Sequence, residues 1–199
     1  MAVRSKLDML VTVFGGSGFL GRHVVRALAK RGYRIRVAVR QPELAGYLQP
    51  IGRVGQIHSV QANLRFPDSV SAAVHDTDAV VNLVGILFER GRQRFDAVMA
   101  TGAQTVAQAA KAVAAPLVHV SAIGADENSP SRYARAKAQG ERLVLGVDDA
   151  SIIVRPSIVF GPEDDFFNRF GALARISPAL PLVGGGHTRV LQEGREVGP

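Results

Sequence analysis

The chain has 199 residues, of which 47% are hydrophobic and 21% charged, a balance typical of one soluble α/β domain. It contains no cysteine, which excludes disulfides and thiol chemistry, and its five histidines stand singly without metal-ligand spacing, so we predict no metal site. No apolar run reaches the roughly 18–20 residues that a membrane-spanning helix needs, and we expect neither a transmembrane segment nor a cleaved leader.

The net charge of +7 is concentrated in the first part of the sequence. Residues 1–53 contain ten Lys or Arg but only two acidic residues. Such an excess attracts an anionic cofactor, an acidic protein surface or anionic lipid. The interleaving of basic and aromatic residues that marks nucleic-acid binding is lacking, so we predict no nucleic-acid partner.

Strand and helix patterns alternate along the chain. Apolar runs typical of strands lie at 9–14, 33–40, 55–60, 78–85, 116–121 and 151–156. Helical patterns lie at 19–28, 67–74, 95–114 and 132–144. The alternation predicts an α/β fold, a Rossmann-type doubly wound parallel sheet.

The glycines of the first strand–helix junction form the strongest motif. Gly15, Gly18 and Gly21 follow an apolar strand and open an amphipathic helix. In that context the first glycine permits the turn, the second admits a pyrophosphate and the third lets the helix approach the sheet. The phosphates then face the helix amino terminus. We predict dinucleotide binding here; the alternative is a plain flexible turn.

The end of the second predicted strand indicates which cofactor is preferred. An acid about 20 residues after the glycines would bind the ribose 2′-hydroxyl of NAD, but this position holds Arg40. A guanidinium suits a 2′-phosphate, so NADP(H) is favoured and NAD(H) is the second choice. The alternative interpretation of Arg40 is a solvated charge at a strand end.

A second set of residues suggests proton transfer. Ser121 ends a predicted strand, and Tyr133 and Lys137 are four residues apart, so they share one helix face. An ammonium near a phenol lowers the phenol's pKa, which suits proton transfer near neutral pH, and Ser121 would bind a substrate carbonyl. The alternative is an ordinary pair on a helix surface.

These motifs resemble the extended or atypical short-chain dehydrogenase/reductases. Longer blocks are similar to one branch, the nucleotide-binding accessory subunits of respiratory complex I and their bacterial homologues; they lie at 13–21, 120–126 and 160–164. The likeness spans residues 10–189. It implies tight NADP(H) binding, a structural role in that complex rather than turnover, and membrane-associated respiratory subunits as partners.

Three departures from the family pattern affect the expected activity. Asn63 stands where many members have an aspartate near the adenine ring, and Met99 replaces an active-site asparagine. Residues 190–199 leave the pattern, from which we expect a truncated carboxyl-terminal lobe. We therefore expect cofactor binding without turnover, with an NADPH-dependent reductase or a nucleotide-sugar-type epimerase/dehydratase as the alternative.

Residues 1–160 form the dinucleotide-binding domain, and 161–199 begin a smaller substrate-side lobe. The protein is expected in the cytoplasm of a bacterium, peripheral to the inner membrane. The candidate catalytic residues are Ser121, Tyr133 and Lys137. The predicted cofactor contacts are Gly15, Ser17, Gly18, Phe19, Leu20, Gly21, Arg40, Asn63, Leu64, Val84, Gly85, Tyr133, Lys137 and Pro156, and Asn82 is expected to line the cofactor as well.

Overall fold

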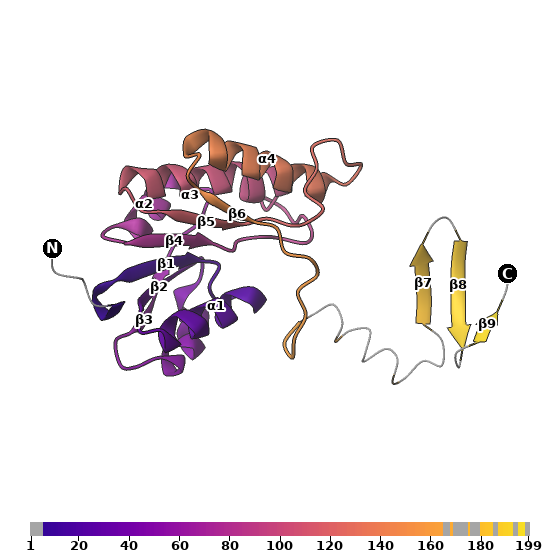
Figure 1. Cartoon of the computed structure of the whole chain (residues 1–199), viewed down its shortest axis with the longest axis horizontal. Coiled ribbons are helices and arrows are strands. Elements are labelled where there is room, and N and C mark those ends of the chain that lie inside the picture. The colour runs from indigo at the N-terminus through magenta and orange to yellow at the C-terminus, as the bar shows by residue number, and fades with distance from the viewer. Residues whose placement is uncertain are drawn as a thin grey trace. The chain divides into compact units, whose positions relative to one another are not determined.

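The computed structural model describes residues 6–164, residues 168 and 175, and the strands 180–184, 187–192 and 195–197. The chain divides into two compact units, residues 1–157 and 158–199. The first holds the parallel sheet with its helices (Figure 1). In the part of the chain that is described, no helix is both long and apolar enough to cross a bilayer.

Six parallel strands form the sheet of the first unit, in the order β3-β2-β1-β4-β5-β6. Their bounds are β1 Leu10–Phe14, β2 Arg34–Val39, β3 Ile57–Gln61, β4 Ala79–Asn82, β5 Leu117–Val120 and β6 Ile152–Val154. The register places Val13 of β1 opposite Val37 of β2 and Val81 of β4. The strand order turns back between β1 and β4, which confirms the predicted doubly wound sheet.

Helices cover both faces of this sheet (Figure 1). Their bounds are α1 Phe19–Lys30, α2 Pro67–Val74, α3 Thr101–Ala112 and α4 Arg132–Val147, with short 3₁₀ helices η1 Lys6–Asp8 and η2 Pro42–Ile51. On one face α2 and α3 bury a cluster that includes Phe14, Val70 and Val106. On the other, α1 and η2 bury Val25, Leu48 and their neighbours. Each face of the sheet therefore has its own apolar core.

The long helix predicted over 95–114 has two parts. A π-helical turn, η3 (Asp96–Ala100), precedes α3. Helix α4 passes so close to this turn that a Cβ on Gly140 would overlap the Met99 carbonyl oxygen. Gly140 therefore permits the close approach of α4 to the π turn, a tertiary contact that the local sequence pattern does not reveal.

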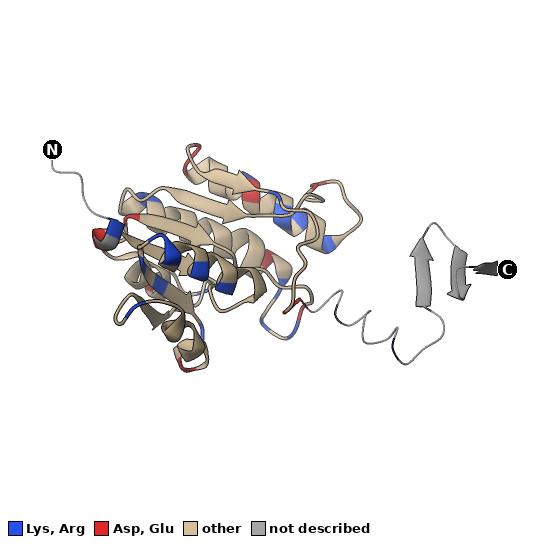
Figure 2. Cartoon of the chain, turned by 60° about the horizontal axis from the view of Figure 1, so that its bottom comes forward, with Lys and Arg blue, Asp and Glu red and all other residues tan. Residues whose placement is uncertain are grey.

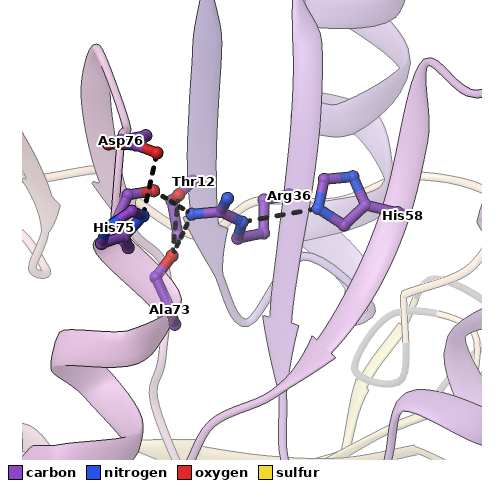
Figure 3. Close-up of polar contacts among 6 residues, drawn as sticks. All are labelled: Thr12, Arg36, His58, Ala73, His75 and Asp76. Carbon is purple, nitrogen blue, oxygen red and sulfur yellow. Dashed lines mark hydrogen bonds and ion pairs between the residues drawn. The ribbon is translucent and has the colours of Figure 1, made fainter.

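A polar row crosses the first three strands on the α2 side of the sheet (Figure 3). Arg36 lies between Thr12 and His58, and its Nη1 donates to the carbonyl oxygens of Ala73 (2.9 Å) and His75 (2.6 Å) at the end of α2. Thr12 Oγ1 also donates to Ala73 O, at 3.1 Å. Burial, and then the neighbouring arginines, lower the pKa of His58, whose Nε2 accepts from Arg36 Nε at 3.4 Å. The row supplies donors to carbonyls that a helix end leaves unpaired.

The second unit contains an antiparallel sheet. Its strands are β7 Leu180–Gly184, β8 His187–Gln192 and β9 Arg195–Val197, in that order. Earlier in this unit, Asp164 Oδ2 accepts a hydrogen bond from the Gly161 amide at 3.1 Å, which closes a turn.

Candidate functional site

A cavity of about 250 Å³ opens at the carboxyl edge of the sheet, between the ends of β1 and β4. This is where the strand order reverses, the usual binding place in open α/β sheets. The residues that line it are Gly15, Ser17, Gly18, Ala38, Val39, Arg40, Ala62, Asn63, Leu64, Arg65, Leu83, Val84, Gly85, Ile86, Gln93 and Val98. The cavity thus joins the glycine turn to the ends of β2, β3 and β4.

The glycines of the turn meet different constraints. Gly15 has φ +75°, a left-handed conformation that favours glycine, and a Cβ there would lie 3.2 Å from the Val84 backbone. A Cβ on Gly21 would overlap the Gly15 carbonyl oxygen, so this glycine allows α1 to pack on the turn. Gly18 is the N-cap of α1, and no side chain caps that end. The first N–H groups of α1 therefore have no side-chain acceptor, which suits a phosphate.

Two arginines line the far end of the cavity. Arg40 is exposed at the end of β2, and Arg65 lies just beyond β3. Asn63 lies beside them, but its Oδ1 accepts from the Arg65 amide at 3.2 Å, so it is partly engaged. The sequence reasoning overlooked Arg65, although its position just after a predicted strand end was a usable signal.

Some predicted cofactor residues do not line this cavity. They are Phe19, Leu20, Gly21, Tyr133, Lys137 and Pro156. The expectation that Asn82 lines the cofactor is wrong: the residue is buried, with its Nδ2 3.1 Å from His119 Nδ1 and its Oδ1 accepting from the Val84 amide at 3.1 Å. Asn82 instead links the ends of β4 and β5 and orients the backbone that borders the cavity.

Lys137 lies beneath the cavity rim. It is only 4% exposed, and its Nζ donates to the Val120 carbonyl at 3.1 Å. A Cβ on Gly85 would lie 3.5 Å from this Nζ, so a lining residue of the cavity and the ammonium are neighbours. Burial lowers the pKa of Lys137 to about 8, against an opposing effect of Glu141.

Tyr133 differs from its predicted state. The ring is half-buried and makes an edge-to-face contact with Phe95, with centroids 5.9 Å apart. Burial raises the pKa of its phenol. The prediction that Lys137 lowers the pKa of Tyr133 is therefore wrong for this structure. The Lys137 ammonium donates its hydrogen bond to the Val120 carbonyl instead.

The Ser121 hydroxyl belongs to a buried polar group that the sequence analysis missed. Ser121 is 4% exposed and its Oγ makes no hydrogen bond of ordinary geometry. Burial raises the pKa of Glu141, but a hydrogen bond from Arg155 (Nε to Oε1, 2.9 Å) and the nearby Ser121 hydroxyl outweigh burial, so the net shift is downward. His119 also belongs to this group, and burial lowers its pKa to about 4. Glu141 lies one helical turn after Lys137, a spacing that was visible in the sequence.

The arrangement places the Lys137 amine next to the cavity, one helical turn after the Tyr133 phenol and close to the strand end that carries the Ser121 hydroxyl. Such groups can exchange a proton with a bound carbonyl or hold the ribose of a cofactor. Met99 is fully buried in an apolar cluster with Val98 and Ala136, against which Phe95 and Tyr133 pack. The cavity can therefore bind a dinucleotide. The groups that could transfer a proton are only partly exposed, because Ser121 and Lys137 are buried and Tyr133 is half-buried.

The fold and the glycine turn define a Rossmann-type dinucleotide-binding protein. Residues 11–180 match the NAD dependent epimerase/dehydratase family, and the chain belongs to it. It is 37% identical over 186 residues to the mouse NADH dehydrogenase [ubiquinone] 1 alpha subcomplex subunit 9, covering 92% of this chain and 49% of the relative. It is 34% identical to the same subunit of Dictyostelium discoideum, over 87% of this chain and 49% of that protein.

A relative with an enzyme name is equally similar. The chain is 35% identical to ceramide reductase of Caulobacter vibrioides, over 87% of this chain and 54% of the relative. The chain thus spans about half the length of the curated relatives it matches.

Solved structures support the fold. Pen from Bacillus thuringiensis superposes with a TM-score of 0.67 at 22% identity, over 84% of this chain and 56% of that one. A short chain dehydrogenase from Bacillus anthracis gives 0.63 at 20% identity, over 73% and 69%.

Proposed function

We propose that the chain binds NADP(H) in the cavity between the ends of β1 and β4. The observation that carries the proposal is the pairing of an uncapped helix start at Gly18 with two guanidiniums, Arg40 and Arg65, at the other end of one cavity. The helix start suits the pyrophosphate, and the guanidiniums suit a 2′-phosphate.

Calorimetry with NADPH and NADH tests the preference. Charge-assisted hydrogen bonds are worth about 1.5–3 kcal/mol, so Arg40→Ala should weaken NADPH binding about ten- to a hundredfold and leave NADH binding nearly unchanged. Arg53→Ala, at an exposed arginine that does not line the cavity, is the matched control. Equal affinity of the unaltered protein for both cofactors would refute the preference.

The glycine turn offers an independent check of the location. A Cβ on Gly18 would meet only the Gly15 carbonyl oxygen, at 3.3 Å, so Gly18→Val should fold while its side chain occupies the place of the pyrophosphate. We expect loss of binding of both cofactors with an unchanged circular dichroism spectrum. Retained affinity in the folded variant would place the nucleotide elsewhere.

We further propose that the protein is an accessory component of NADH:ubiquinone oxidoreductase rather than a catalyst, held peripherally at the cytoplasmic face of the inner membrane. Support comes from the relatives named as subunits of that complex. The buried Ser121, the raised pKa of Tyr133 and the apolar Met99 agree with binding without turnover.

An NADPH-dependent reductase is the second candidate. The relative named ceramide reductase and the presence of Ser121, Tyr133 and Lys137 in one region favour it. An epimerase or dehydratase acting on a nucleotide sugar would use the same three side chains.

Absorbance of NADPH in the presence of ketones, keto-lipids among them, separates the two candidates. We expect negligible carbonyl-dependent loss of absorbance. Lys137→Ala should weaken cofactor binding, whereas Tyr133→Phe should not. Turnover that disappears in Tyr133→Phe would establish the reductase instead.

A further inference from the structure

Helix α1 carries a row of basic side chains along one face. Arg22, Arg26 and Lys30 are spaced four residues apart, so they lie one above the other on the helix. Arg26 and Lys30 are exposed, and Arg22 is half-buried. The helix has 12 residues and is therefore about 18 Å long, and the row extends over most of it.

The segment that contains η2 and the turn after it carries exposed apolar side chains. Leu44 is 67% exposed, Tyr47 is 46% exposed and Val54 is fully exposed. Single exposed apolar residues are ordinary on protein surfaces, but here three stand within residues 44–54. Leu48 of the same helix is fully buried against the sheet, so η2 has a second, outward apolar side.

The basic and apolar rows lie side by side. The Arg22 guanidinium stacks over the Tyr47 ring at 5.5 Å, and the Tyr47 hydroxyl donates to the Ser17 carbonyl at 2.6 Å, next to the start of α1. Near the other end of α1, Gln56 Nε2 donates to the Ala29 carbonyl at 2.9 Å. The segment 42–56 therefore runs along α1 in the same direction as the helix.

Positive charge dominates this surface. Arg31 and Arg53 are also exposed there, whereas Glu43 is the single acidic residue in the sequence from 19 to 56. Figure 2, which brings this side of the molecule forward, shows blue Lys and Arg segments close together. The excess of basic residues noted in the sequence is thus gathered mainly outside the cofactor cavity, which Arg40 alone of these residues lines.

We infer that this α1–η2 surface, made of Arg22, Arg26, Lys30, Arg53, Leu44, Tyr47 and Val54, binds the surface of an anionic phospholipid membrane. The basic row faces lipid phosphates, and the apolar row inserts between the headgroups. Interfacial membrane segments combine these two features, and each basic residue near an anionic leaflet contributes to binding. An acidic protein would pair with the charges but would leave the outward apolar row unexplained. The inference rests on the proposed peripheral position at the membrane, for which it names the binding surface, and it does not depend on cofactor binding.

Co-sedimentation of the whole chain with vesicles tests this inference. We expect binding to phosphatidylcholine vesicles that contain phosphatidylglycerol and none to phosphatidylcholine alone. The double variant Arg26→Glu, Lys30→Glu should weaken binding at least roughly twentyfold. Loss of each basic side chain lowers the affinity about fivefold, and reversal of its charge lowers it further. Leu44→Ser with Val54→Ser should weaken it about tenfold. Lys111→Glu with Arg142→Glu, an equal charge change at exposed positions of α3 and α4, should bind almost normally.

Several outcomes would overturn the inference. They are absence of binding by the unaltered protein, equal loss in the α3–α4 control, and full retention by the serine variant, which would show that no apolar side chain inserts. Thermal unfolding verifies that each variant folds. NADPH affinity measured in parallel should stay unchanged, so a failed membrane test leaves the cofactor proposal standing, and the reverse also holds.

Discussion

The cofactor cavity and the Ser121–Lys137 region share one edge of the sheet but consist of different kinds of chemical groups. The cavity is formed by backbone around Gly15 and Gly18 and by an exposed guanidinium at Arg40. The neighbouring region is formed by ionisable side chains withdrawn from water, among them Lys137 and Glu141. Backbone recognition requires no desolvated charge, whereas a buried charge opposes folding unless it is paired. The first region should therefore respond to shape, and the second to protonation.

The largest expected effect concerns the close backbone packing that both regions need and that a glycine permits in each. Gly21→Ala and Gly140→Ala each place a Cβ against a carbonyl oxygen, of Gly15 and Met99 respectively. Backbone cannot move aside as a side chain does, so each variant should lose about 3 kcal/mol of unfolding free energy or fail to fold. Chemical denaturation measures the loss.

Gly146→Ala is the matched control on α4, because a Cβ there has open space around it. Gly146 lies in the last turn of α4 and its φ is not positive, so alanine fits there and this variant should gain up to about 0.5 kcal/mol. A similar response of Gly140→Ala and Gly146→Ala would mean that α4 does not approach the π turn closely.

The buried ammonium should give the next largest effect. The pKa of Lys137 is about 8 in the folded chain against 10.5 in its ordinary state, so below pH 8 both states are protonated and the full cost of burial is present. Lys137→Met should therefore raise the unfolding free energy at pH 7 by up to about 3 kcal/mol, less the lost bond to Val120. Above pH 8 the folded state releases the proton, and the advantage should shrink until about pH 10.5.

Denaturation of both proteins across this pH range, with NADPH titration alongside, checks the Lys137 prediction. The variant should be more stable but bind the cofactor less well, since the amine lies next to the cavity rim. A less stable Lys137→Met protein at pH 7 would show that the ammonium is better compensated than its surroundings indicate.

A smaller effect, confined to acid, is expected at His119. Its pKa falls from 6.5 to about 4 on burial, so the unfolded state takes up the proton first as pH decreases. The neutral His119 therefore contributes up to about 3 kcal/mol to the unfolding free energy. This contribution is fully present above pH 6.5 and is lost by about pH 4. His119→Gln should be less sensitive to acid over that interval than the unaltered protein. Parallel acid dependences would contradict the prediction.

Much of the fold was predictable because its signals are local. The alternating apolar runs and the glycine turn predicted the parallel doubly wound sheet, which the structure confirms. Helix η2 was missed because its prolines, Pro42 and Pro50, argue against a helix; Pro42 stands at its start and Pro50 near its end, where a 3₁₀ helix accommodates them.

The polar group around Ser121 was less predictable, because burial is a tertiary property. Glu141 has the sequence context of a residue on the solvent side of a helix. It is buried because Gly140 lets α4 approach the π turn and because β5 and β6 end beside it. The same packing withdraws Lys137 from water, which no residue spacing could have revealed.

The hydrogen bonds of Arg36 have a consequence for how strand β2 finds its partners. Even-numbered residues of β2 face α2, and odd-numbered ones, such as Ile35 and Val37, face the α1 core. A slip by one residue would turn the guanidinium into that apolar core, because side chains alternate between the faces. A slip by two would put Arg34 or Ala38 opposite Thr12 and take Arg36 away from the end of α2. Arg36 thus disfavours the slips by one residue and the slip that would put Ala38, which has no donor, opposite Thr12.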